Sequence, residues 1–380
     1  MASRAEAVGV GRLAPVATNV HLPVRVSPPD NVSDAGSLIT RMRHVLQRGA
    51  SGIRLVYANW SNVDGRDVPG PDPITVSAKV VTDAEHDVVF SGSRHLRLEP
   101  GEAGISDPVD ISGRAGLAFL TDTTVEPDPG GTVPLGSQTN ADDGEGVAPG
   151  ASAVVRPGTA HGYGPWQVLG DIGSAAGTAP TVLVTGDSNA VGFGDVRGSA
   201  YHLGWVQRAL QPEFPTLNLA VSGATARGAL SGPSRRRRRV LLQWARPRVA
   251  IAALGTNDLQ QGGPGLVEMQ DLLIEHWRDL AALGSRVLAC TIPPVTTSGD
   301  GWRTLAGQTP TAGARVRAQV NDWLRSVPSP LAGVIDVAAA LGAPASPSLW
   351  RPGFTRDGLH PNQTGHRVAA ERVDPAFLRA

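Results

Sequence analysis

The chain divides into two halves that differ in the periodicity of their apolar residues. From about residue 179 onward, five apolar runs of strand length are each followed by a segment of helical length, and these runs read TVLVTGDS, LNLAVSG, RVAIAALGTND, RVLACTIPP and GVIDVAA. One segment, PGLVEMQDLLIEHWRDLAALG, carries large apolar residues near a single helical face, at Leu266, Met269, Leu273, Trp277 and Leu280. Strands that alternate with helices indicate a five-stranded parallel sheet with helices on both faces, a three-layer α/β/α domain.

The first half has a shorter period. Between about residues 38 and 125, short and often alternating apolar runs such as GIRLVYANW, ITVSAKVV and GLAFLTDT are separated by Gly, Pro, Asp and Asn. Runs of this kind favour an all-β antiparallel sandwich over β-α-β units. The sequence therefore predicts an N-terminal arm over 1–35, a sandwich with a Gly/Pro-rich linker over 36–178, and a flavodoxin-like α/β/α domain over 179–380.

Polar residues collect where the predicted parallel strands end. The first strand runs into GDSN at 186–189, the second into SG at 222–223 and the third into GTND at 255–258, while DGLH at 357–360 precedes the last helix. In an open parallel sheet, ligands bind beyond the carboxyl ends of the strands. We therefore expect these four segments to meet at one edge of the sheet.

These segments contain the residue types of nucleophilic acyl transfer. A serine hydroxyl is a weak nucleophile that needs an adjacent base, and a neutral imidazole is suited to that task, so we predict Ser188 as nucleophile and His360 as base. Asp357 lies three residues from His360 and can orient its ring. The oxyanion of a tetrahedral intermediate needs preset donors, for which the backbone N–H groups of Ser188 and Gly223 and the amide of Asn257 are candidates.

In their order along the chain, GDSN, the glycine of NLAVSGAT, GTND and DGLHP resemble the four blocks of the SGNH/GDSL hydrolase family. The resemblance implies that Ser188 is the nucleophile, that Gly223 and Asn257 donate to the oxyanion, and that Asp357 and His360 complete the triad. It covers the whole α/β half of the chain. The first half more loosely resembles the β-sandwich that precedes the catalytic domain in some esterases of this group.

The predicted function is that of a carboxylic ester hydrolase. It would cleave small acyl esters, above all acetyl esters, through an acyl-enzyme on Ser188, and it needs neither a metal nor an organic cofactor. Family analogy adds acylated carbohydrate as the substrate. Two alternatives stay open, namely acyl transfer at the same site and a non-catalytic carbohydrate-binding protein in which the sandwich is the binding module.

Composition limits the range of partners. The chain has 34 basic and 34 acidic residues, which argues against nucleic acid or an anionic membrane surface as a partner. No apolar stretch reaches the ~18 residues of a membrane span. The N-terminus lacks the apolar core of a signal peptide, which favours the cytoplasm. Nothing in the sequence indicates the oligomeric state.

Several other residues have structural interpretations. Asp187 and Asp258 are predicted to make local hydrogen bonds outside the triad. The single cysteine, Cys290, lies in an apolar run and is predicted to be a buried thiol. His366 could join Asp357 and His360 in a metal site, but no other ligand-rich motif supports that alternative. The run Arg235–Arg239 is interpreted as a solvated helix face.

Overall fold

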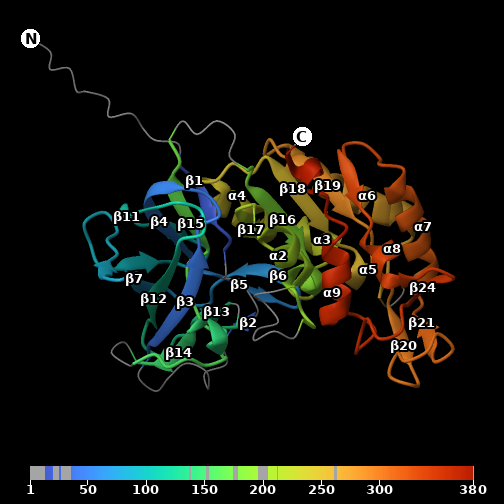
Figure 1. Cartoon of the computed structure of the whole chain (residues 1–380), viewed down its shortest axis with the longest axis horizontal. Coiled ribbons are helices and arrows are strands. Elements are labelled where there is room, and N and C mark those ends of the chain that lie inside the picture. Colours follow the sequence, from blue (N-terminus) through green and yellow to red (C-terminus); the bar gives the residue numbers. More distant parts are fainter. Residues whose placement is uncertain are drawn as a thin grey trace, which may run out of the picture.

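The computed structural model describes residues 13–19, 25–26, 36–136, 138–150, 154–173, 179–195, 204–211, 213–260 and 263–379. Figure 1 shows two parts side by side, with the strands of the first half at the left and the strands and helices of the second half at the right.

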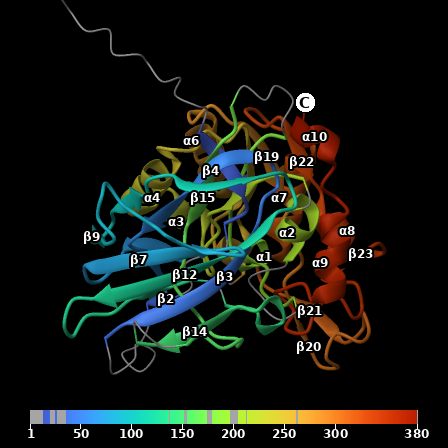
Figure 2. The same ribbon diagram turned by 60° about the vertical axis from the view of Figure 1, so that its left-hand side comes forward.

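The first half is built from two antiparallel sheets. One sheet has the order β1 (Leu13–Ala17), β15 (Gln167–Asp171), β4 (Ala50–Ala58) and β10 (Ala103–Ile105), with β11 (Val109–Gly113) also paired to β4. The other has the order β14 (Gly146–Pro149), β3 (Leu38–Val45), β12 (Ala118–Pro127), β7 (Ile74–Val81) and β8 (Glu85–Asp87), with β9 (Leu96–Leu98) paired to β7. Figure 2 shows β7, β12, β3 and β14 in this order.

The interior of the sandwich follows from the alternation of its strands. Buried and more exposed residues alternate along β3 and β7, because successive side chains of a strand point to opposite faces of the sheet. The inward side chains form one apolar cluster that includes Leu55, Tyr57, Val76, Val80 and Val125. The predicted all-β sandwich is confirmed.

The structure corrects the expected role of two segments of the first half. Residues 1–35 were predicted to be an arm, but β1 pairs with β15 inside the first sheet and β2 (Arg25–Val26) pairs with β13 (Pro134–Leu135). Most of that segment lies outside the described residues. The predicted linker contains β14 and β15, which complete the two sheets.

The second half contains the predicted parallel sheet. Its strands have the order β17 (Thr216–Asn218), β16 (Val182–Gly186), β18 (Val249–Ala253), β19 (Arg286–Cys290) and β22 (Gly333–Ile335), and all neighbouring pairs are parallel. Every residue of β16 is buried, as expected for a strand that helices cover on both faces. The α/β/α fold with five parallel strands is confirmed.

Helices cover both faces of this sheet. The longer ones are α2 (Gly204–Leu210), α4 (Gly232–Leu242), α6 (Leu266–Ala281), α7 (Ala314–Arg325) and α9 (Gln363–Ala370). Short helices are α1 (Ser188–Val191), α3 (Ala226–Ala229), α5 (Thr256–Leu259), α8 (Val337–Leu341) and α10 (Pro375–Arg379). The first part of the helix that we predicted over SAYHLGWVQRALQ lies outside the described residues.

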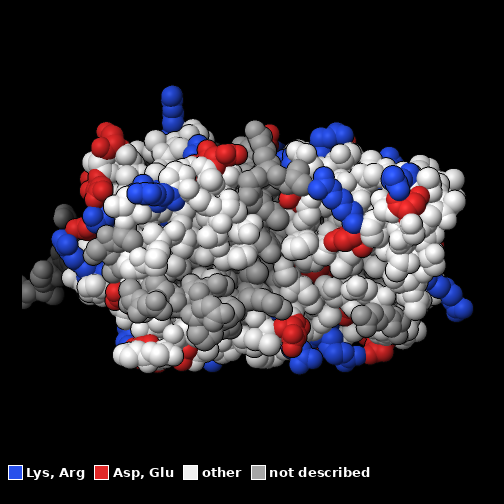
Figure 3. All heavy atoms as spheres, turned by 90° about the horizontal axis from the view of Figure 1, so that it is seen from below, with Lys and Arg blue, Asp and Glu red and all other residues white. Residues whose placement is uncertain are grey.

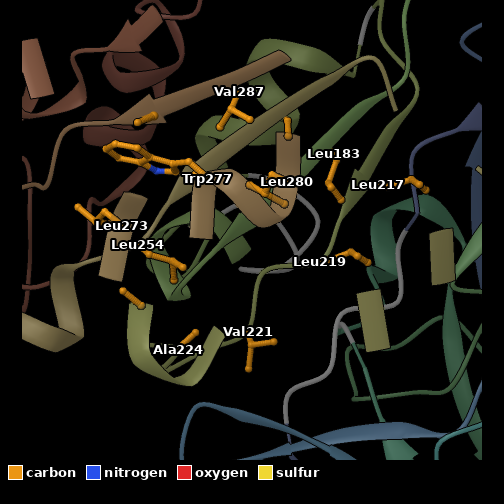
Figure 4. Packing of buried hydrophobic residues seen from close by; sticks show 14 of the residues in the cluster. Leu183, Leu217, Leu219, Val221, Ala224, Leu254, Leu273, Trp277, Leu280 and Val287 are labelled. Carbon is orange, nitrogen blue, oxygen red and sulfur yellow. The ribbon is translucent and has the colours of Figure 1, made fainter. Parts of the chain in front are cut away.

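Two apolar clusters flank the sheet. Leu183 and Val287 face one cluster with Trp277 and Leu280 of α6, as Figure 4 shows, and α4 and α7 contribute to the same cluster. Val182 and Val184 point to the opposite cluster, which contains residues of α2, α8 and α9. Neighbouring residues of β16 therefore serve different layers, because a strand alternates its side chains.

Some elements differ from the prediction. The run GVIDVAA was predicted as one strand, but β22 ends at Ile335, because Asp336 accepts a hydrogen bond from Ala339 N at 3.1 Å and so begins α8. The hairpins β20–β21 (Thr296–Ser298 and Gln308–Pro310) and β23–β24 (Gly342–Ala343 and Ser346–Trp350) were not predicted at all.

The two halves share a tightly packed boundary. Ala58, Trp60 and Trp166 of the sandwich are buried in the same cluster as residues of α4 and α6. Arg237 and Asp67 form a buried ion pair across the boundary. The interpretation of Arg235–Arg239 as a solvated face is therefore wrong in part, because Arg237 and Arg238 are only 1% and 6% exposed.

The surface offers no single-signed charged area on the face that Figure 3 shows. Basic and acidic side chains are interspersed there between broad uncharged areas. In the described part of the chain, none of the helices combines the length and the apolar composition that a membrane crossing requires.

Candidate active site

Ser188 stands at the turn between β16 and α1. Asp187 caps this helix, with its Oδ1 accepting a hydrogen bond from Asn189 N at 2.9 Å. Ser188 is therefore the first helical residue, and its side chain leaves the sheet at the carboxyl end of β16. The structure gives Asp187 the local hydrogen-bonding role that the sequence predicts, and burial raises the pKa of its carboxyl group.

Ser188, His360 and Asp357 form a continuous chain of hydrogen bonds. Ser188 Oγ lies 2.8 Å from His360 Nε2, and His360 Nδ1 lies 2.6 Å from Asp357 Oδ2. A neutral imidazole that donates from Nδ1 to the carboxylate leaves Nε2 free to accept the serine proton. The structure thus brings the three side chains together in the order that the sequence analysis predicts.

Asp357 is held in its charged form. Burial acts to raise its pKa, but the hydrogen bonds from the His360 ring and from the backbone N–H groups of His360 and Leu359 outweigh burial. The net pKa lies well below the ordinary value for an aspartate. An ionised carboxylate accepts the hydrogen bond from His360 Nδ1 and so fixes the orientation of the ring.

The loop that carries Asp357 and His360 is fixed by neighbours in its own domain. Thr355 Oγ1 accepts from Gly358 N at 2.9 Å and donates to His360 O at 2.7 Å. The carbonyl of Gly358 accepts from Thr296 N and from the indole Nε1 of Trp350, both at 3.0 Å. Every one of these partners lies beyond β19 in the chain.

Gly223 and Asn257 follow the two strands that flank β16. Gly223 comes after β17 and Asn257 after β18, so the sheet order places both next to the strand that leads to Ser188. The Asn257 Nδ2 group donates one hydrogen bond to Ala224 O at 2.9 Å, which leaves its second N–H available. Within the described ranges, the backbone N–H groups of Ser188 and Gly223 donate to no protein acceptor.

Two other titratable residues near the site, Asp258 and His366, have structural partners. Asp258 accepts a hydrogen bond at 2.9 Å from the backbone N–H of Ala226, the first residue of α3. His366 Nδ1 accepts from Trp205 N at 3.1 Å and Nε2 donates to Phe193 O at 2.9 Å, so both ring nitrogens are occupied. Cys290 is a buried free thiol whose pKa is raised by burial. No group of three potential metal ligands occurs among the described residues.

Sequence reasoning missed two residues at this edge. The ring of Phe193 lies 4.5 Å from the ring of His360, between centroids, and is 39% exposed. Gly65, at the tip of a hairpin of the sandwich, packs against the backbone of Gly223. The Asp-Gly pair at 64–65 is a hairpin signal in the sequence, but it does not indicate which surface the hairpin contacts.

Comparisons with known proteins agree with these motifs. Residues 184–368 match the model of the GDSL-like Lipase/Acylhydrolase family. No curated protein matches the chain. Many solved structures do match.

Three of these solved structures are esterases. One is a carbohydrate acetylesterase from Sinorhizobium meliloti, with 16% identity and a TM-score of 0.36, covering 50% of this chain and 94% of that chain. Another is a catalytic mutant of an acetylxylan esterase from Geobacillus stearothermophilus, with 20% identity and a TM-score of 0.34, covering 52% and 93%. A psychrotrophic esterase from Pseudoalteromonas sp. has 20% identity and a TM-score of 0.35, covering 51% and 93%. On the match to the family model, the second half of this chain belongs to the GDSL-like lipase/acylhydrolase family.

Proposed function

We propose that this protein is a serine esterase that hydrolyses small acyl esters, with Ser188 as nucleophile, His360 as general base and acid, and Asp357 as the residue that orients His360. The observation that carries the proposal is the hydrogen-bonded chain from Ser188 Oγ through His360 to Asp357. A serine activated in this way attacks carbonyl carbons and forms an acyl-enzyme.

The first half of the reaction forms that acyl-enzyme. Ser188 Oγ bonds to the ester carbonyl carbon while its proton passes to His360 Nε2. The carbonyl oxygen becomes an oxyanion, which the N–H groups of Ser188 and Gly223 and the second amide N–H of Asn257 stabilise. The tetrahedral intermediate then collapses, the carbon–oxygen bond to the alcohol breaks, and His360 returns the proton to the departing alcohol.

The second half releases the acid. Water gives a proton to His360 Nε2 as its oxygen attacks the acyl carbon, and the same donors stabilise the second oxyanion. Ser188 then leaves with the proton from His360, and the carboxylic acid is released. An alcohol in place of this water would give acyl transfer, so the site itself serves both outcomes.

The proposed substrate is a small acyl group, above all acetyl, on a carbohydrate hydroxyl. The acyl and alcohol parts of this proposal rest on the family resemblance, because a fold does not determine a substrate. A sugar-binding role for the sandwich lacks support. Every Trp, Tyr and Phe between residues 36 and 173 is buried, which leaves this part no exposed aromatic ring on which a sugar could stack.

The direct test is hydrolysis of p-nitrophenyl esters of increasing chain length by wild type and Ser188→Ala. We expect Ser188→Ala to lower kcat by about 10⁴-fold or more, because the triad acts as a unit. Ser346→Ala, at the first residue of β24 and without a hydrogen bond to any triad residue, is the matched control and should keep wild-type activity. Mass spectrometry should find a fluorophosphonate adduct on the Ser188 peptide of wild type.

Two results would contradict the proposal. One is a Ser188→Ala variant that keeps more than about a tenth of wild-type turnover, where a lost triad member costs orders of magnitude. The other is a wild-type protein that hydrolyses none of the esters, including acetylated sugars, and shows no adduct. Adding a competing alcohol and measuring acylated product then separates transfer from hydrolysis.

A further inference from the structure

A hairpin of the sandwich reaches the proposed oxyanion site. Strand β5 (Trp60–Val63) pairs with β6 (Arg66–Pro69) across a turn at Asp64 and Gly65, whose φ angles are 49° and 74°. Two positive φ values in a two-residue loop define a type I′ turn, which suits the twist of a tight hairpin. Figure 1 shows this hairpin extending from the sandwich toward the α/β domain.

The hairpin tip contacts the backbone that carries one proposed donor. A side chain at Gly65 would overlap the carbonyl oxygen of Gly223, and its Cβ would lie 2.8 Å from Ala224 N. Conversely, a Cβ at Gly223 would lie 3.3 Å from Gly65 Cα. The two glycines therefore let the hairpin and the loop pack backbone against backbone, and the Gly223–Ala224 peptide has no room to move toward the hairpin.

The same peptide segment is linked to the second proposed donor. Asn257 Nδ2 donates to Ala224 O at 2.9 Å, so the orientation of the Asn257 amide depends on where Ala224 lies. Gly65 packs against the segment Gly223–Ala224, and Asn257 is hydrogen-bonded to the same segment. A displacement of this segment would move both the Gly223 N–H and the Asn257 amide.

A buried ion pair anchors the hairpin to the α/β domain. Arg237 of α4 is 1% exposed and pairs with Asp67 of β6, which is 7% exposed. The Arg237 Nη2 group also donates to Leu219 O at 3.1 Å, in the segment that leads from β17 to Gly223. One arginine thus connects the hairpin to the start of the oxyanion loop, and breaking such a buried pair is costly.

We infer that the β5–β6 hairpin positions the oxyanion donors, with Gly65 and Asp67 as positioning residues that touch neither substrate nor reacting atoms. The inference rests on the proposed function, because it assigns a support to the same site. Preset donors lose their effect when they are displaced by a fraction of an ångström, so a donor loop needs a rigid support. The sandwich provides that support from the other half of the chain.

The test is steady-state kinetics of Gly65→Ala with p-nitrophenyl acetate. We expect kcat to fall about 10- to 1000-fold, up to the loss that follows removal of one oxyanion donor. KM should change little, because the donors act mainly once charge has moved onto oxygen. The pH dependence of kcat/KM should keep its wild-type shape, since the triad is untouched. A loss of folded protein would also lower the apparent kcat at constant KM, so circular dichroism is used to measure the folded fraction of each variant, and kcat is calculated per folded enzyme.

Gly130→Ala is the matched control. Gly130 lies in the sandwich at φ 79°, and a Cβ there meets no atom within 4 Å. It therefore imposes the same backbone strain as Gly65→Ala without the contact to Gly223. If thermal denaturation shows that Gly65→Ala is unfolded where Gly130→Ala is folded, Gly65→Asn is the variant to measure, because asparagine tolerates a positive φ better and its Cβ makes the same overlap.

The outcomes separate this inference from the proposed function. A folded Gly65 variant whose kcat stays within about threefold of the control overturns the inference, since a displaced donor costs at least tenfold. So does a variant that raises KM while kcat holds, which would make the hairpin a wall of the binding site. Ser188→Ala measured in parallel tests the proposed function: if Ser188→Ala is inactive and Gly65→Ala is normal, only the hairpin inference fails.

Discussion

The proposed acid–base loop and the proposed oxyanion loop are held in place in different ways. The loop of Asp357 and His360 is supported by Thr296, Trp350 and Thr355, all within the α/β domain. The Gly223 loop is supported by Gly65 from the sandwich. The contacts that hold the proposed triad therefore lie within one domain, whereas the proposed oxyanion loop is contacted both by its own domain and by the sandwich.

This difference assigns separate tasks to the two halves of the chain. The proposed proton transfer involves only residues of the α/β domain, which are joined by hydrogen bonds within that domain. Under our inference, stabilisation of the oxyanion also uses the sandwich surface at Gly65, so the sandwich would influence turnover without touching substrate. Substitutions in each region should consequently change different kinetic quantities.

The largest expected effect among tests of this comparison is that of Asn257→Ala. We expect kcat to fall about 100- to 1000-fold with little change in KM, because one preset donor is lost. Steady-state kinetics on p-nitrophenyl acetate measures this, with circular dichroism to compare folding with wild type. A rise in KM at constant kcat would show instead that Asn257 binds the ground-state substrate.

Combining Asn257→Ala with Gly65→Ala sharpens the result. Because both changes disturb the same donors, the double variant should lose less than the product of the two single losses. Losses that simply multiply would mean that the hairpin and Asn257 act independently. That result would contradict the inference that the hairpin positions the donors of the oxyanion loop.

The second prediction concerns the loss of stability at low pH near the loop of Asp357 and His360. His366 lies on α9, just after His360, and joins Trp205 N to Phe193 O. Burial lowers the pKa of His366 to about 4, against roughly 6.5 in the unfolded chain. The unfolded state therefore binds more protons than the folded state between these two pH values. Above pH ~6.5 the neutral His366 does not lower the free energy of unfolding. As the pH falls from ~6.5 toward 4, the free energy of unfolding decreases by about 3 kcal/mol in all.

His366→Gln should remove this part of the acid sensitivity. The free energy of unfolding, measured by urea denaturation at several pH values from 7 to 4, should fall less steeply in the variant than in wild type. The variant should be less stable than wild type at pH 7, where the neutral ring makes its two hydrogen bonds. Parallel pH curves for the two proteins would mean that His366 does not titrate in this range.

The smallest expected effect is that of Thr355→Val. Valine keeps the shape of threonine but leaves the N–H of Gly358 without its acceptor, a loss worth about 1–3 kcal/mol if it is not compensated. Part of this free energy is lost from the stability of the folded protein and not from catalysis, so we expect kcat to fall about tenfold or less. In the double variant with Gly65→Ala, the two losses in kcat should multiply, because the two residues support separate loops. A strongly non-additive loss would show that the two loops are energetically coupled and not supported separately.

Much of the α/β domain could be predicted because its signals are local. The run of apolar and β-branched residues that ends at Gly186 indicates a buried parallel strand, and the polar residues after three successive strands indicate a common edge. The predicted Ser188, Asp357 and His360 lie within hydrogen-bonding distance along the chain of contacts that we expected. The extent of the short elements was harder to predict, because Asp336 begins a helix inside an apolar run.

The contacts between the halves could not be predicted from the sequence. Arg237 and Arg238 lie in a run of five arginines that suggests a solvated face, yet they are buried because Asp67 and Asp279 compensate them. Those partners are distant in the chain, and no local pattern links them. The same holds for Gly65 and Gly223, each of which reads as a turn glycine when taken alone.

The packing of Trp60 and Trp166 against the α/β domain restricts how this protein can evolve. Both side chains are fully buried in a cluster that also contains Leu217 and Leu241. Recombination that exchanged the first half for an unrelated domain would leave a cavity there, at a cost of several kcal/mol for each missing tryptophan. The same exchange would remove the β5–β6 hairpin. We therefore expect the two halves to be inherited together and not to recombine as separate domains.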